Sequence, residues 1–599
     1  MKILDIYENA PDSYSNKNYS LVWCSRLDTN IKNISSIYDL INDQSKNLKI
    51  ESSNFLQNFF NDNKIYFYPF FNLKKDFTYL TLSNFIEKNP YKKNINLNIL
   101  KILALNNFIR KNKFDKIIVH TKKEDFLRDI NNIIKIRNKP QNKLNLINKF
   151  LKLTKLYFKN LIQFVIFFIK NISFKNKPNS TINKKPIFFS FFSYTDKKKA
   201  MSGIYHSEYW KGFSNTNNKN WVHLHDYCFN YQNSKDTRKA IKNLNLNKKV
   251  PNHFFLDDYL NIKIFIKTIF TYNKFYFLTS KLILSKNFSK ILEKKLYLTN
   301  KDNFFFFNEF ISYNTIRNIL FFYQFEEFFL KNKIESDIFY TFENQPWEKI
   351  LLYFLKKNKF NKKTYGTIHS PVRFWDLRFI NFNNNKSILG YFNPDKILFN
   401  SAFIKKILLL NGYKKKELIP VETLRYLNFN KIEKNKKKLS RGSNKKINLL
   451  ILSDYDDNLN NHFIKIINNF KSNNKYCFFL KCHPLKPLKI IQDNVIIISD
   501  INHIKKNIDL VIVANKTAAA LDLYYKNFDT LIFLDKDDLD YSPLHRFTNY
   551  RTFSSLEDLK KILDIYHLKS KESIVNTDTK SMYFNTNKSL IGWKKIIRL

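Results

Sequence analysis

Residues 477–525 contain three short apolar runs that decide the fold class of this 599-residue chain. The runs are CFFL at Cys477–Leu480, VIII at Val495–Ile498 and LVIV at Leu510–Val513. Each ends in polar or turn-forming residues, and the connections between them are long enough for helices. Continuous apolar runs of this length are typical of strands buried on both faces of a parallel sheet. We therefore predict an α/β fold with functional residues where its strands end.

Two of these strand ends carry groups that suit a bound anion. The first run passes into KCHP at 481–484, where the proline stops the strand. The third passes into NKT at 515–517 and then into AAALDLYY, a good helix former. Backbone N–H groups, a hydroxyl and a lysine at a helix N-terminus favour a phosphate, which we place between His483 and Thr517. Taken separately, each feature is also explained by an ordinary loop or helix cap.

Together these motifs resemble the donor-binding half of GT-B glycosyltransferases, most nearly the bacterial surface-carbohydrate enzymes that carry K-x-H-P. In sialyltransferases and capsule polymerases of that kind, the His-Pro and a following Ser/Thr pair hold the donor phosphate, and a helix carboxylate contacts the ribose. The second motif matches in part, because a lysine stands at one position of the usual pair. The donor-binding residues that the resemblance implies are Lys481, His483, Pro484, Asn515, Lys516, Thr517 and Asp522.

A second pair of strand ends lies between residues 336 and 379. The predicted strand Asp337–Thr341 is followed by Glu343, and the predicted strand Thr364–Ile368 by His369. The runs ENQPWE and GTIHS around them also resemble the surface-polysaccharide GT-B group. Inverting glycosyl transfer needs a base for the acceptor hydroxyl, so we predict Glu343 as the first catalytic candidate and His369 as the second. The alternative for Glu343 is a cap of the following helix.

Candidates for acceptor contact come from two stretches. The stretch KKPIFFSFFSYTD at 184–196 resembles the first strand and loop of a GT-B N-terminal domain, and GIYHSEYWKGF at 203–213 follows it. Aromatic rings stack on sugars, although core packing explains them equally well. After His369 the loop PVRFWDLRF offers guanidinium groups for an acidic sugar. The predicted acceptor-binding residues are His206, Glu208, Trp210, Arg373 and Asp376.

The resemblance implies two Rossmann-like domains that face a cleft, with an additional N-terminal α/β region and helical insertions. We predict the N-terminal region at 1–183, an acceptor domain at 184–394 with a helical insertion at 254–333, and a nucleotide-sugar donor domain at 395–599. The length of the chain suits this division, because single cores rarely grow so large. A last helix that packs back on the first of the two domains would fit GT-B.

The formal charge of +51 suggests an anionic partner. Its plainer explanation is the codon bias of an AT-rich genome, since lysine, asparagine and isoleucine abound together. No basic run with interleaved aromatic residues stands out, so we expect no nucleic acid partner. A predicted helix at 151–174 has lysines at both ends and an apolar centre far shorter than the roughly 20 residues of a spanning helix. It fits either a helix in the interface of an anionic membrane or one packed on the protein.

The remaining signals concern metals, cofactors and location. The cysteines show neither disulfide nor zinc spacing. Asp454-Tyr455-Asp456 is the nearest D-x-D motif, and we discount it as a metal site. The strand INLLILSD is followed by no glycine-rich cradle, which argues against a dehydrogenase. We expect no metal and no cofactor. The N-terminus lacks the apolar core of a signal peptide, so we expect a cytoplasmic protein, with peripheral contact at the inner face of the cell membrane as a further option.

The resemblance therefore predicts an inverting, metal-independent glycosyltransferase of bacterial surface polysaccharide (O-antigen or capsule) biosynthesis. Its donor would be a nucleotide sugar, with a CMP-linked acidic sugar favoured. Its acceptor would be lipid-linked or a polysaccharide. Two alternatives stay open: a phosphotransferase of cell-surface polymer synthesis that uses a CDP-linked alcohol, and a non-catalytic basic protein that binds nucleic acid or membrane.

Overall fold

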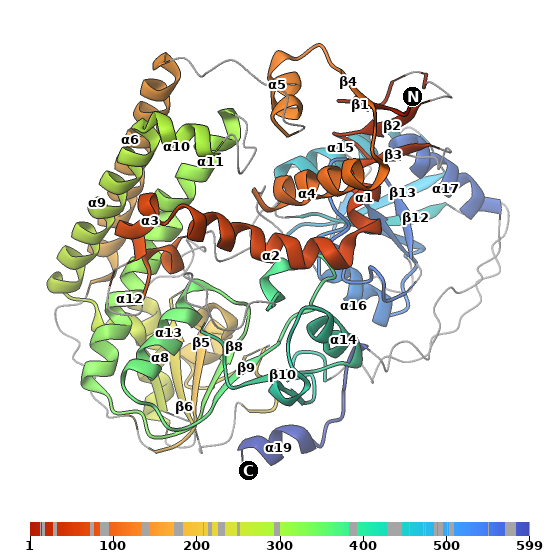
Figure 1. The fold of residues 1–599 in the computed structure, drawn as a ribbon. Helices are drawn as coiled ribbons and strands as arrows, with labels where there is room; N and C mark the ends of the chain where they lie inside the picture. The colour runs from red at the N-terminus through yellow and green to blue at the C-terminus, as the bar shows by residue number, and fades with distance from the viewer. Residues whose placement is uncertain are drawn as a thin grey trace.

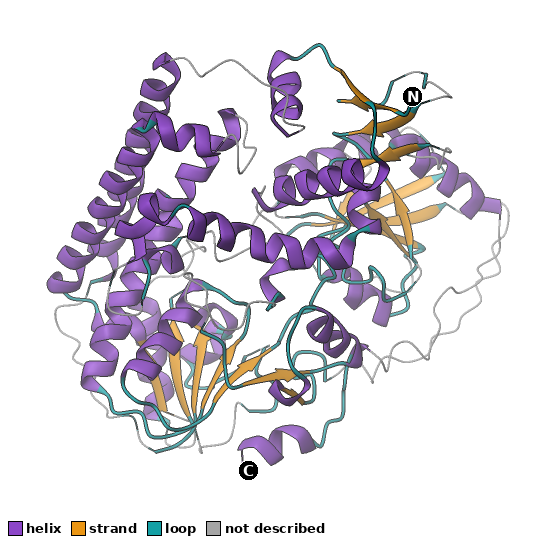
Figure 2. Ribbon diagram, in the orientation of Figure 1, coloured by secondary structure: helices purple, strands orange, loops and turns teal. Residues whose placement is uncertain are grey.

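In the described part of the chain, three sheets of parallel strands form the framework of the protein in the computed structural model (Figure 1). Helices connect the strands and cover the sheets (Figure 2). Two of the predicted site residues, Glu208 and Pro484, lie outside the described residues. The structure describes all residues except 12, 15–17, 28–32, 72, 74–76, 84–94, 134–142, 173–181, 183, 208, 214–218, 226–233, 248–251, 293–299, 382–391, 428–445, 455, 471–472, 474, 484–487, 489–494, 500, 502–507, 549, 569–582 and 598–599.

The first sheet has four strands in the order β3-β2-β1-β4. Apolar side chains of its strands share a core with α1 and α4. Ser36 and Asp39 form a capping box that begins α1, since each side chain accepts a hydrogen bond from the other residue's backbone N–H. The elements of this region are β1 (Ile3–Tyr7), β2 (Tyr19–Val22), β3 (Ile34–Ser36), α1 (Ile37–Asp43), α2 (Ser45–Asp62), α3 (Lys64–Phe71), α4 (Ile95–Asn112), β4 (Lys116–His120) and α5 (Glu124–Ile133).

The second sheet has seven strands in the order β11-β10-β9-β8-β5-β6-β7. The chain starts in the centre, runs outward to β7, and returns to the other side of β5 with β8. This is a doubly wound Rossmann order, whose switch point lies between β5 and β8. The strands are β5 (Ile187–Phe191), β6 (Asn220–Leu224), β7 (Asn252–Phe255), β8 (Ile338–Thr341), β9 (Thr364–Thr367), β10 (Lys396–Phe399) and β11 (Leu418–Pro420).

Helices cover both faces of this sheet, and those between β7 and β8 form a separate layer (Figure 2). The helices α9 to α12 lie within the predicted helical insertion at 254–333, whose first two residues belong to β7. The long helix α6 packs on α9, α11 and α12, so it joins this layer rather than the four-stranded sheet. The helices are α6 (Lys143–Asn171), α7 (Lys197–Met201), α8 (Ser234–Leu246), α9 (Ile262–Leu284), α10 (Lys286–Ile291), α11 (Asn300–Ile311), α12 (Tyr313–Lys331), α13 (Pro346–Lys357) and α14 (Ala402–Leu410).

The boundary predicted between residues 394 and 395 does not coincide with the sheets. β10 and β11 pair in parallel with β9, and so extend the second sheet to Pro420. The sequence of β10 is an ordinary buried strand, and its partner is decided only by tertiary packing. The passage to the third sheet therefore lies after β11, in the segment that contains Arg425.

The third sheet has six strands in the order β14-β13-β12-β15-β16-β17. The three apolar runs at 477–513 form β13, β14 and β15 as predicted, but β14 lies at the edge of the sheet, and its Ile496 and Ile497 are 49% and 56% exposed rather than buried. β12 separates β13 from β15, so the two motifs predicted to bind an anion are one strand apart at the same edge. The elements are β12 (Ile447–Leu452), α15 (Asp457–Phe470), β13 (Tyr476–Lys481), β14 (Val495–Ile497), β15 (Leu510–Ala514), α16 (Ala519–Tyr525), β16 (Thr530–Phe533), β17 (Arg551–Phe553), α17 (Leu556–Leu568) and α19 (Ile591–Ile597).

The last helix, α19, returns to the second sheet. Trp593 packs 5.0 Å from the ring of Phe213 and 6.2 Å from that of Trp210, between ring centroids. The Glu422 carboxylate accepts hydrogen bonds from the backbone N–H groups of Gly592 and Trp593, at 2.9 and 3.3 Å. The predicted α/β fold with two Rossmann-like domains is confirmed, and the last helix packs back on the first of these two domains.

The N-terminal region contacts both large sheets' loops. Arg26 donates to the backbone carbonyl of Asp538, beyond β16, at 2.9 and 3.0 Å. Lys49 of α2 lies 3.7 Å from the ring centroid of Phe374, in the loop after β9. The N-terminal region therefore packs against loops of both large sheets.

Candidate active site at the edges of two sheets

Glu343 follows β8 at the switch point of the seven-stranded sheet. The next residue, Asn344, has a left-handed backbone conformation (φ 57°), which turns the chain sharply before α13 begins. Asparagine tolerates this conformation better than most residues. Its side chain holds the turn, because Nδ2 donates to the Arg378 carbonyl at 2.6 Å. The turn leaves the Glu343 side chain beyond the strand end rather than in the helix.

Glu348, not Glu343, caps the helix. Its buried carboxylate accepts hydrogen bonds from the backbone N–H groups of Glu343, Asn344 and Gln345, at 2.8, 3.0 and 3.2 Å. The alternative reading of Glu343 as the cap is therefore wrong. Burial raises the pKa of Glu348, and the neighbouring Lys349 and these backbone N–H groups oppose that rise.

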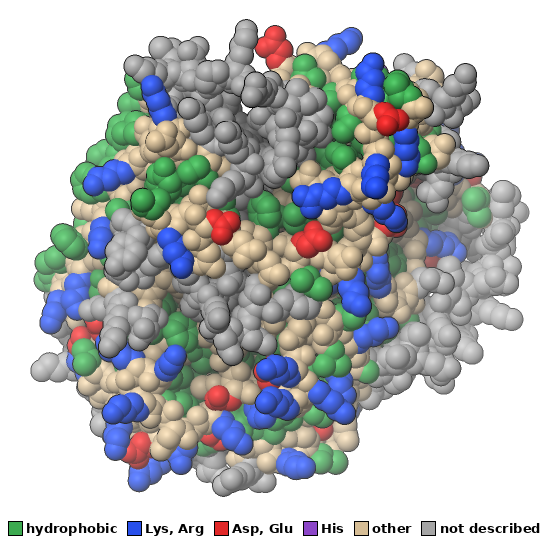
Figure 3. All heavy atoms as spheres, in the orientation of Figure 1, with side chains coloured by type: hydrophobic (Ala, Val, Ile, Leu, Met, Phe, Trp, Pro, Cys, Tyr) green, Lys and Arg blue, Asp and Glu red, His purple; other side chains and the backbone are tan. Residues whose placement is uncertain are grey.

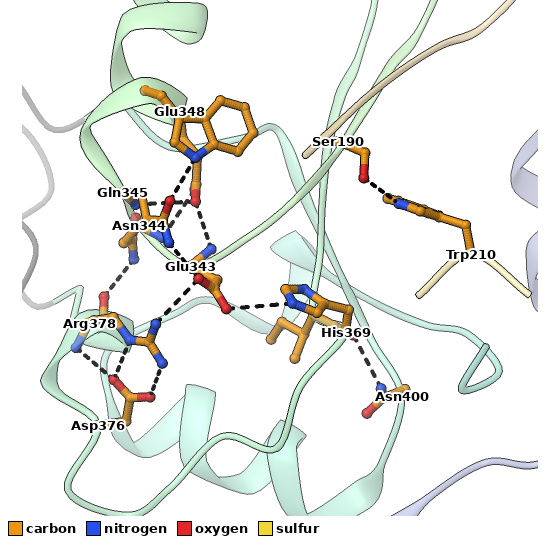
Figure 4. Close-up of polar contacts among 12 residues, drawn as sticks. Ser190, Trp210, Glu343, Asn344, Gln345, Glu348, His369, Asp376, Arg378 and Asn400 are labelled. Atoms are coloured by element: carbon orange, nitrogen blue, oxygen red, sulfur yellow. Dashed lines mark hydrogen bonds and ion pairs between the residues drawn. The ribbon is translucent and has the colours of Figure 1, made fainter. Parts of the chain in front are cut away.

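The Glu343 carboxylate has three polar neighbours (Figure 4). Gln345 Nε2 donates to Oε2 at 2.6 Å. Arg378 Nη1 lies 3.5 Å from Oε2, and His369 Nε2 lies 3.5 Å from Oε1. The two predicted catalytic residues are therefore adjacent, and the side chain of Glu343 is 16% exposed. A carboxylate held in this way, yet still reached by solvent, can accept a proton from a bound hydroxyl.

His369 follows β9 and is buried. Burial lowers its pKa to about 4, although the Glu343 carboxylate opposes the shift. The imidazole is therefore neutral near pH 7. The ring of Tyr209 lies edge-on to it at 4.8 Å between ring centroids, and the tilted ring of Tyr194 lies at 5.8 Å. Of the aromatic residues Tyr205, Tyr209 and Trp210 in the stretch 203–213, Tyr209 is therefore in contact with His369.

Asp376 fixes Arg378 in place. The guanidinium donates to both oxygens of the Asp376 carboxylate, from Nε at 2.9 Å and from Nη2 at 2.7 Å. Such a bidentate pair sets the orientation as well as the charge. Asp376 was predicted to bind the acceptor, but its side chain is completely buried. It acts through Arg378, which it holds toward Glu343.

The other predicted acceptor residues have internal contacts too. Trp210 is 1% exposed and its Nε1 donates to Ser190 Oγ at 3.1 Å, so it belongs to the core. Arg373 Nη2 donates to the Lys516 carbonyl at 2.8 Å and joins the loops of the two sheets. His206 is half-buried, and its carbonyl accepts from the Asp196 N–H at 2.8 Å. Burial and pairing thus favour structural roles for Trp210 and Arg373.

On the six-stranded sheet, His483 follows β13. Its backbone N–H donates to Ser453 Oγ, at the end of β12, at 2.7 Å. The imidazole is half-buried, burial lowers its pKa, and the Asp454 carboxylate opposes this shift. The side chain is thus placed at the strand edge with its ring partly open to solvent.

The residues of the second motif, 515–517, make two different kinds of contact. Thr517 Oγ1 accepts from the Ala519 N–H at 3.3 Å and stays at the start of α16. Asn515 is buried, and its Nδ2 donates to the Leu539 carbonyl at 3.0 Å. The Lys516 ammonium is paired with Asp538 at 2.5 Å. Asn515 and Lys516 therefore support the loop after β16, whereas Thr517 keeps its hydroxyl at the start of α16, at the same sheet edge as His483.

Arg425, which sequence reasoning missed, lies between the two edges. Its guanidinium carbon is 5.1 Å from the ring centroid of Tyr209. Its positive charge lowers the pKa of His369 on one side and opposes the burial that raises the pKa of Asp522 on the other. Lys481 also acts on Asp522. One guanidinium is therefore an electrostatic neighbour of both sheet edges. The sequence offered one indication of its importance, since Arg425 is an arginine and most basic residues of this chain are lysines.

In the described part of the chain, no group of three or more His, Cys, Asp or Glu residues could hold a metal ion. Asp454 and Asp456 make local turn contacts, in which the Asp456 N–H donates to Asp454 Oδ1 at 3.1 Å.

Comparison with known proteins gives weak similarities. No protein-family model and no curated protein matches the sequence. Among solved structures, the calicheamicin glycosyltransferase CalG4 is 6% identical and has a TM-score of 0.37, with 69% of this chain and 98% of that chain covered. UDP-GlcNAc 2-epimerase from Neisseria meningitidis bound to UDP-GlcNAc is 10% identical with a TM-score of 0.35, and the coverage is 69% and 99%. Anabaena Alr3699/HepE in complex with UDP and glucose is 9% identical with a TM-score of 0.31, and the coverage is 69% and 95%. Similarities at this level carry no argument about activity.

Proposed function

We propose that the protein is a glycosyltransferase that binds a nucleotide-activated sugar at the edge of the six-stranded sheet and an acceptor at the edge of the seven-stranded sheet. The observation that supports this most is the position of Arg425, whose charge acts on both His369 and Asp522. The second base candidate, His369, which lies 3.5 Å from Glu343, and the ribose candidate, Asp522, are thus neighbours of one cation. Transfer between two bound substrates needs this proximity.

The base in this proposal is Glu343. Its carboxylate accepts the proton of the acceptor hydroxyl while the oxygen attacks the anomeric carbon of the donor. Arg378 and Gln345 hold the carboxylate in position. His369 is neutral, so it can donate a hydrogen bond to Glu343 without competing for the proton. Because attack and departure occur on opposite sides of that carbon, the reaction inverts its configuration.

The leaving group is the nucleotide phosphate. Its negative charge grows as the glycosidic bond breaks, and cations placed there beforehand stabilise it. Lys481, His483 and Arg425 supply such charges or donors, and Thr517 adds a hydroxyl. The proposal needs no metal ion, because these groups carry out the charge neutralisation. We favour a CMP-linked acidic sugar as the donor and a bacterial surface polysaccharide or its lipid-linked precursor as the acceptor.

Thermal-shift measurements with CMP, CDP, UDP and GDP, alone and as sugar conjugates, test this proposal. We expect one nucleotide class to raise the melting temperature in a dose-dependent manner. Mass spectrometry of an acceptor incubated with that donor should then show the mass of one added sugar, and EDTA should leave the rate unchanged. A product joined through phosphate, formed from a CDP-linked alcohol, would identify a phosphotransferase instead. Stabilisation by RNA and by no nucleotide would contradict both enzymes.

A further inference from the structure

The helices α6 and α9 form an antiparallel pair on the outside of the helical layer (Figure 1). Phe168, near the end of α6, packs 4.3 Å from Phe265, near the start of α9, between ring centroids. Tyr157 packs at the same distance from Tyr276, further along α9. At 29 and 23 residues, the helices are about 43 and 35 Å long. Together they present a long, two-helix surface.

The inner sides of both helices are fixed to the protein. Asn160 of α6 and Tyr272 of α9 both donate to the carbonyl of Ile311 at the end of α11, at 2.8 and 2.6 Å. Thr271 and Tyr323 of α12 share a hydrogen bond of 2.6 Å between their hydroxyls. The opposite sides of α6 and α9 therefore point away from the body of the protein.

Those outer sides are apolar. In both helices the exposed large apolar residues recur at spacings of three, four or seven, which places them in one stripe along each helix. Each of these side chains is between 48% and 73% exposed. The residues are Ile147, Leu151, Phe158, Ile162, Ile166 and Ile169 of α6, and Ile262, Ile266, Phe270, Phe277 and Leu284 of α9. Contiguous exposed apolar surface of this kind marks an interaction site.

The charged residues of the two helices have one sign. Neither helix contains an aspartate or a glutamate. Figure 3 shows hydrophobic and basic side chains together along the margin where Figure 1 places these helices. The exposed lysines are Lys152, Lys155, Lys159 and Lys170 of α6, and Lys263, Lys274 and Lys281 of α9. Protein interfaces are depleted in lysine, and nucleic acid gives exposed isoleucines no partner. An anionic lipid surface suits both features, since acyl chains take the apolar side chains and headgroups pair with the lysines.

We propose that the outer face of α6 and α9 is a docking surface for an anionic lipid bilayer, on which both helices lie in the interface plane. No described helix is long and apolar enough to cross a membrane. The pattern at 151–174 suggested one interfacial helix or one packed helix, whereas α6 has a packed side and an exposed side, and α9 doubles the exposed surface. This inference is independent of the proposed glycosyl transfer.

Vesicle co-sedimentation of the full chain tests the proposal. We expect binding to phosphatidylcholine vesicles with about 30% phosphatidylglycerol, weaker binding to phosphatidylcholine alone, and a decrease with added salt. The double variant Phe270→Ser with Phe277→Ser should partition at least about tenfold more weakly. Lys155→Glu with Lys159→Glu should weaken binding to the anionic vesicles by about fivefold or more for each lysine.

Matched controls use residues of equal type elsewhere on the surface. Leu246→Ser with Ile591→Ser removes two side chains of α8 and α19 that are 72% and 62% exposed. Lys362→Glu with Lys363→Glu makes the same charge change on another surface. Both controls should bind like the unmodified protein, and circular dichroism should show unchanged helix content in all variants. Light scattering that shows a dimer, converted to a monomer by the phenylalanine variant without any vesicle binding, would overturn the proposal. Equal vesicle binding by all variants would overturn it too.

Discussion

The edges of the two large sheets are built differently. At the seven-stranded sheet, Glu343, His369, Arg378 and Asp376 are joined in one chain of side-chain contacts (Figure 4). At the six-stranded sheet, His483 is positioned through its backbone N–H and its imidazole remains half-buried. The first edge is therefore preorganised by charge, and the second is preorganised by the backbone.

This difference predicts which property of the protein a substitution at each edge should change. In a closed network of buried charges, loss of one member leaves another without a partner, so the whole protein is destabilised. At an edge where the side chain faces solvent, loss of that side chain removes a ligand contact and little else. The first edge should therefore respond in stability and turnover, and the second in nucleotide affinity.

The largest expected effect is that of Asp376→Ala. The variant leaves the buried Arg378 guanidinium without its bidentate partner, and breaking such a pair costs about 3–5 kcal/mol of the free energy of unfolding. Chemical denaturation measures this loss. As a control, Lys197→Ala breaks the exposed ion pair with Asp236, which is worth less than about 1 kcal/mol. Equal losses in the two variants would contradict the contrast between the edges.

The pH dependence of stability should identify His369. Its folded-state pKa is about 4, below the ordinary value of 6.5. As the pH falls through 6.5, the unfolded chain binds a proton at this histidine and the folded protein does not. The free energy of unfolding therefore falls between pH 6.5 and about 4, by up to about 3 kcal/mol from this residue.

The buried His223 also has a lowered pKa, so it too reduces the free energy of unfolding as the pH falls. Comparison of the unmodified protein with His369→Gln therefore isolates the contribution of His369. Denaturant titrations between pH 4 and pH 7 should give the variant a shallower pH dependence than the unmodified protein. Identical slopes would show that His369 titrates normally and is not held neutral beside Glu343.

Turnover should depend on Glu343. Glu343→Gln preserves the shape and the contact with Arg378 but cannot accept a proton. We expect the rate of transfer to fall on the order of a hundredfold or more, equivalent to about 2.7 kcal/mol. If this variant turns over normally and His369→Ala is inactive, His369 is the base; if neither matters, the chemistry lies elsewhere.

Much of the fold could be predicted because buried parallel strands have a local signature. The runs at 477–513 and the strands before Glu343 and His369 are continuous apolar segments with polar ends, and all of them form strands at the expected places. Sheet membership has no such signature. β10 was assigned to the second large domain, although it pairs with β9, because pairing depends on segments distant in sequence.

The candidate site was predictable only where it follows a strand. Glu343, His369 and His483 do so. Arg425 lies in an irregular segment, where only its residue type, an arginine among many lysines, distinguishes it. Trp210 was predicted to bind the acceptor but belongs to the core. An aromatic residue that stacks on a sugar and one that fills the core have the same sequence pattern, so the sequence does not separate these two roles. The roles of Asp376 and Glu348 also depend on partners that the sequence does not name.

The central claim is that the two edges divide binding from chemistry, and calorimetric titration of the donor nucleotide into two variants tests it most directly. His483→Ala should bind the nucleotide roughly tenfold more weakly, because it loses a charge-assisted contact with the phosphate. Glu343→Gln should bind it with the affinity of the unmodified protein. The opposite result, in which Glu343→Gln loses nucleotide affinity and His483→Ala retains it, would contradict this account.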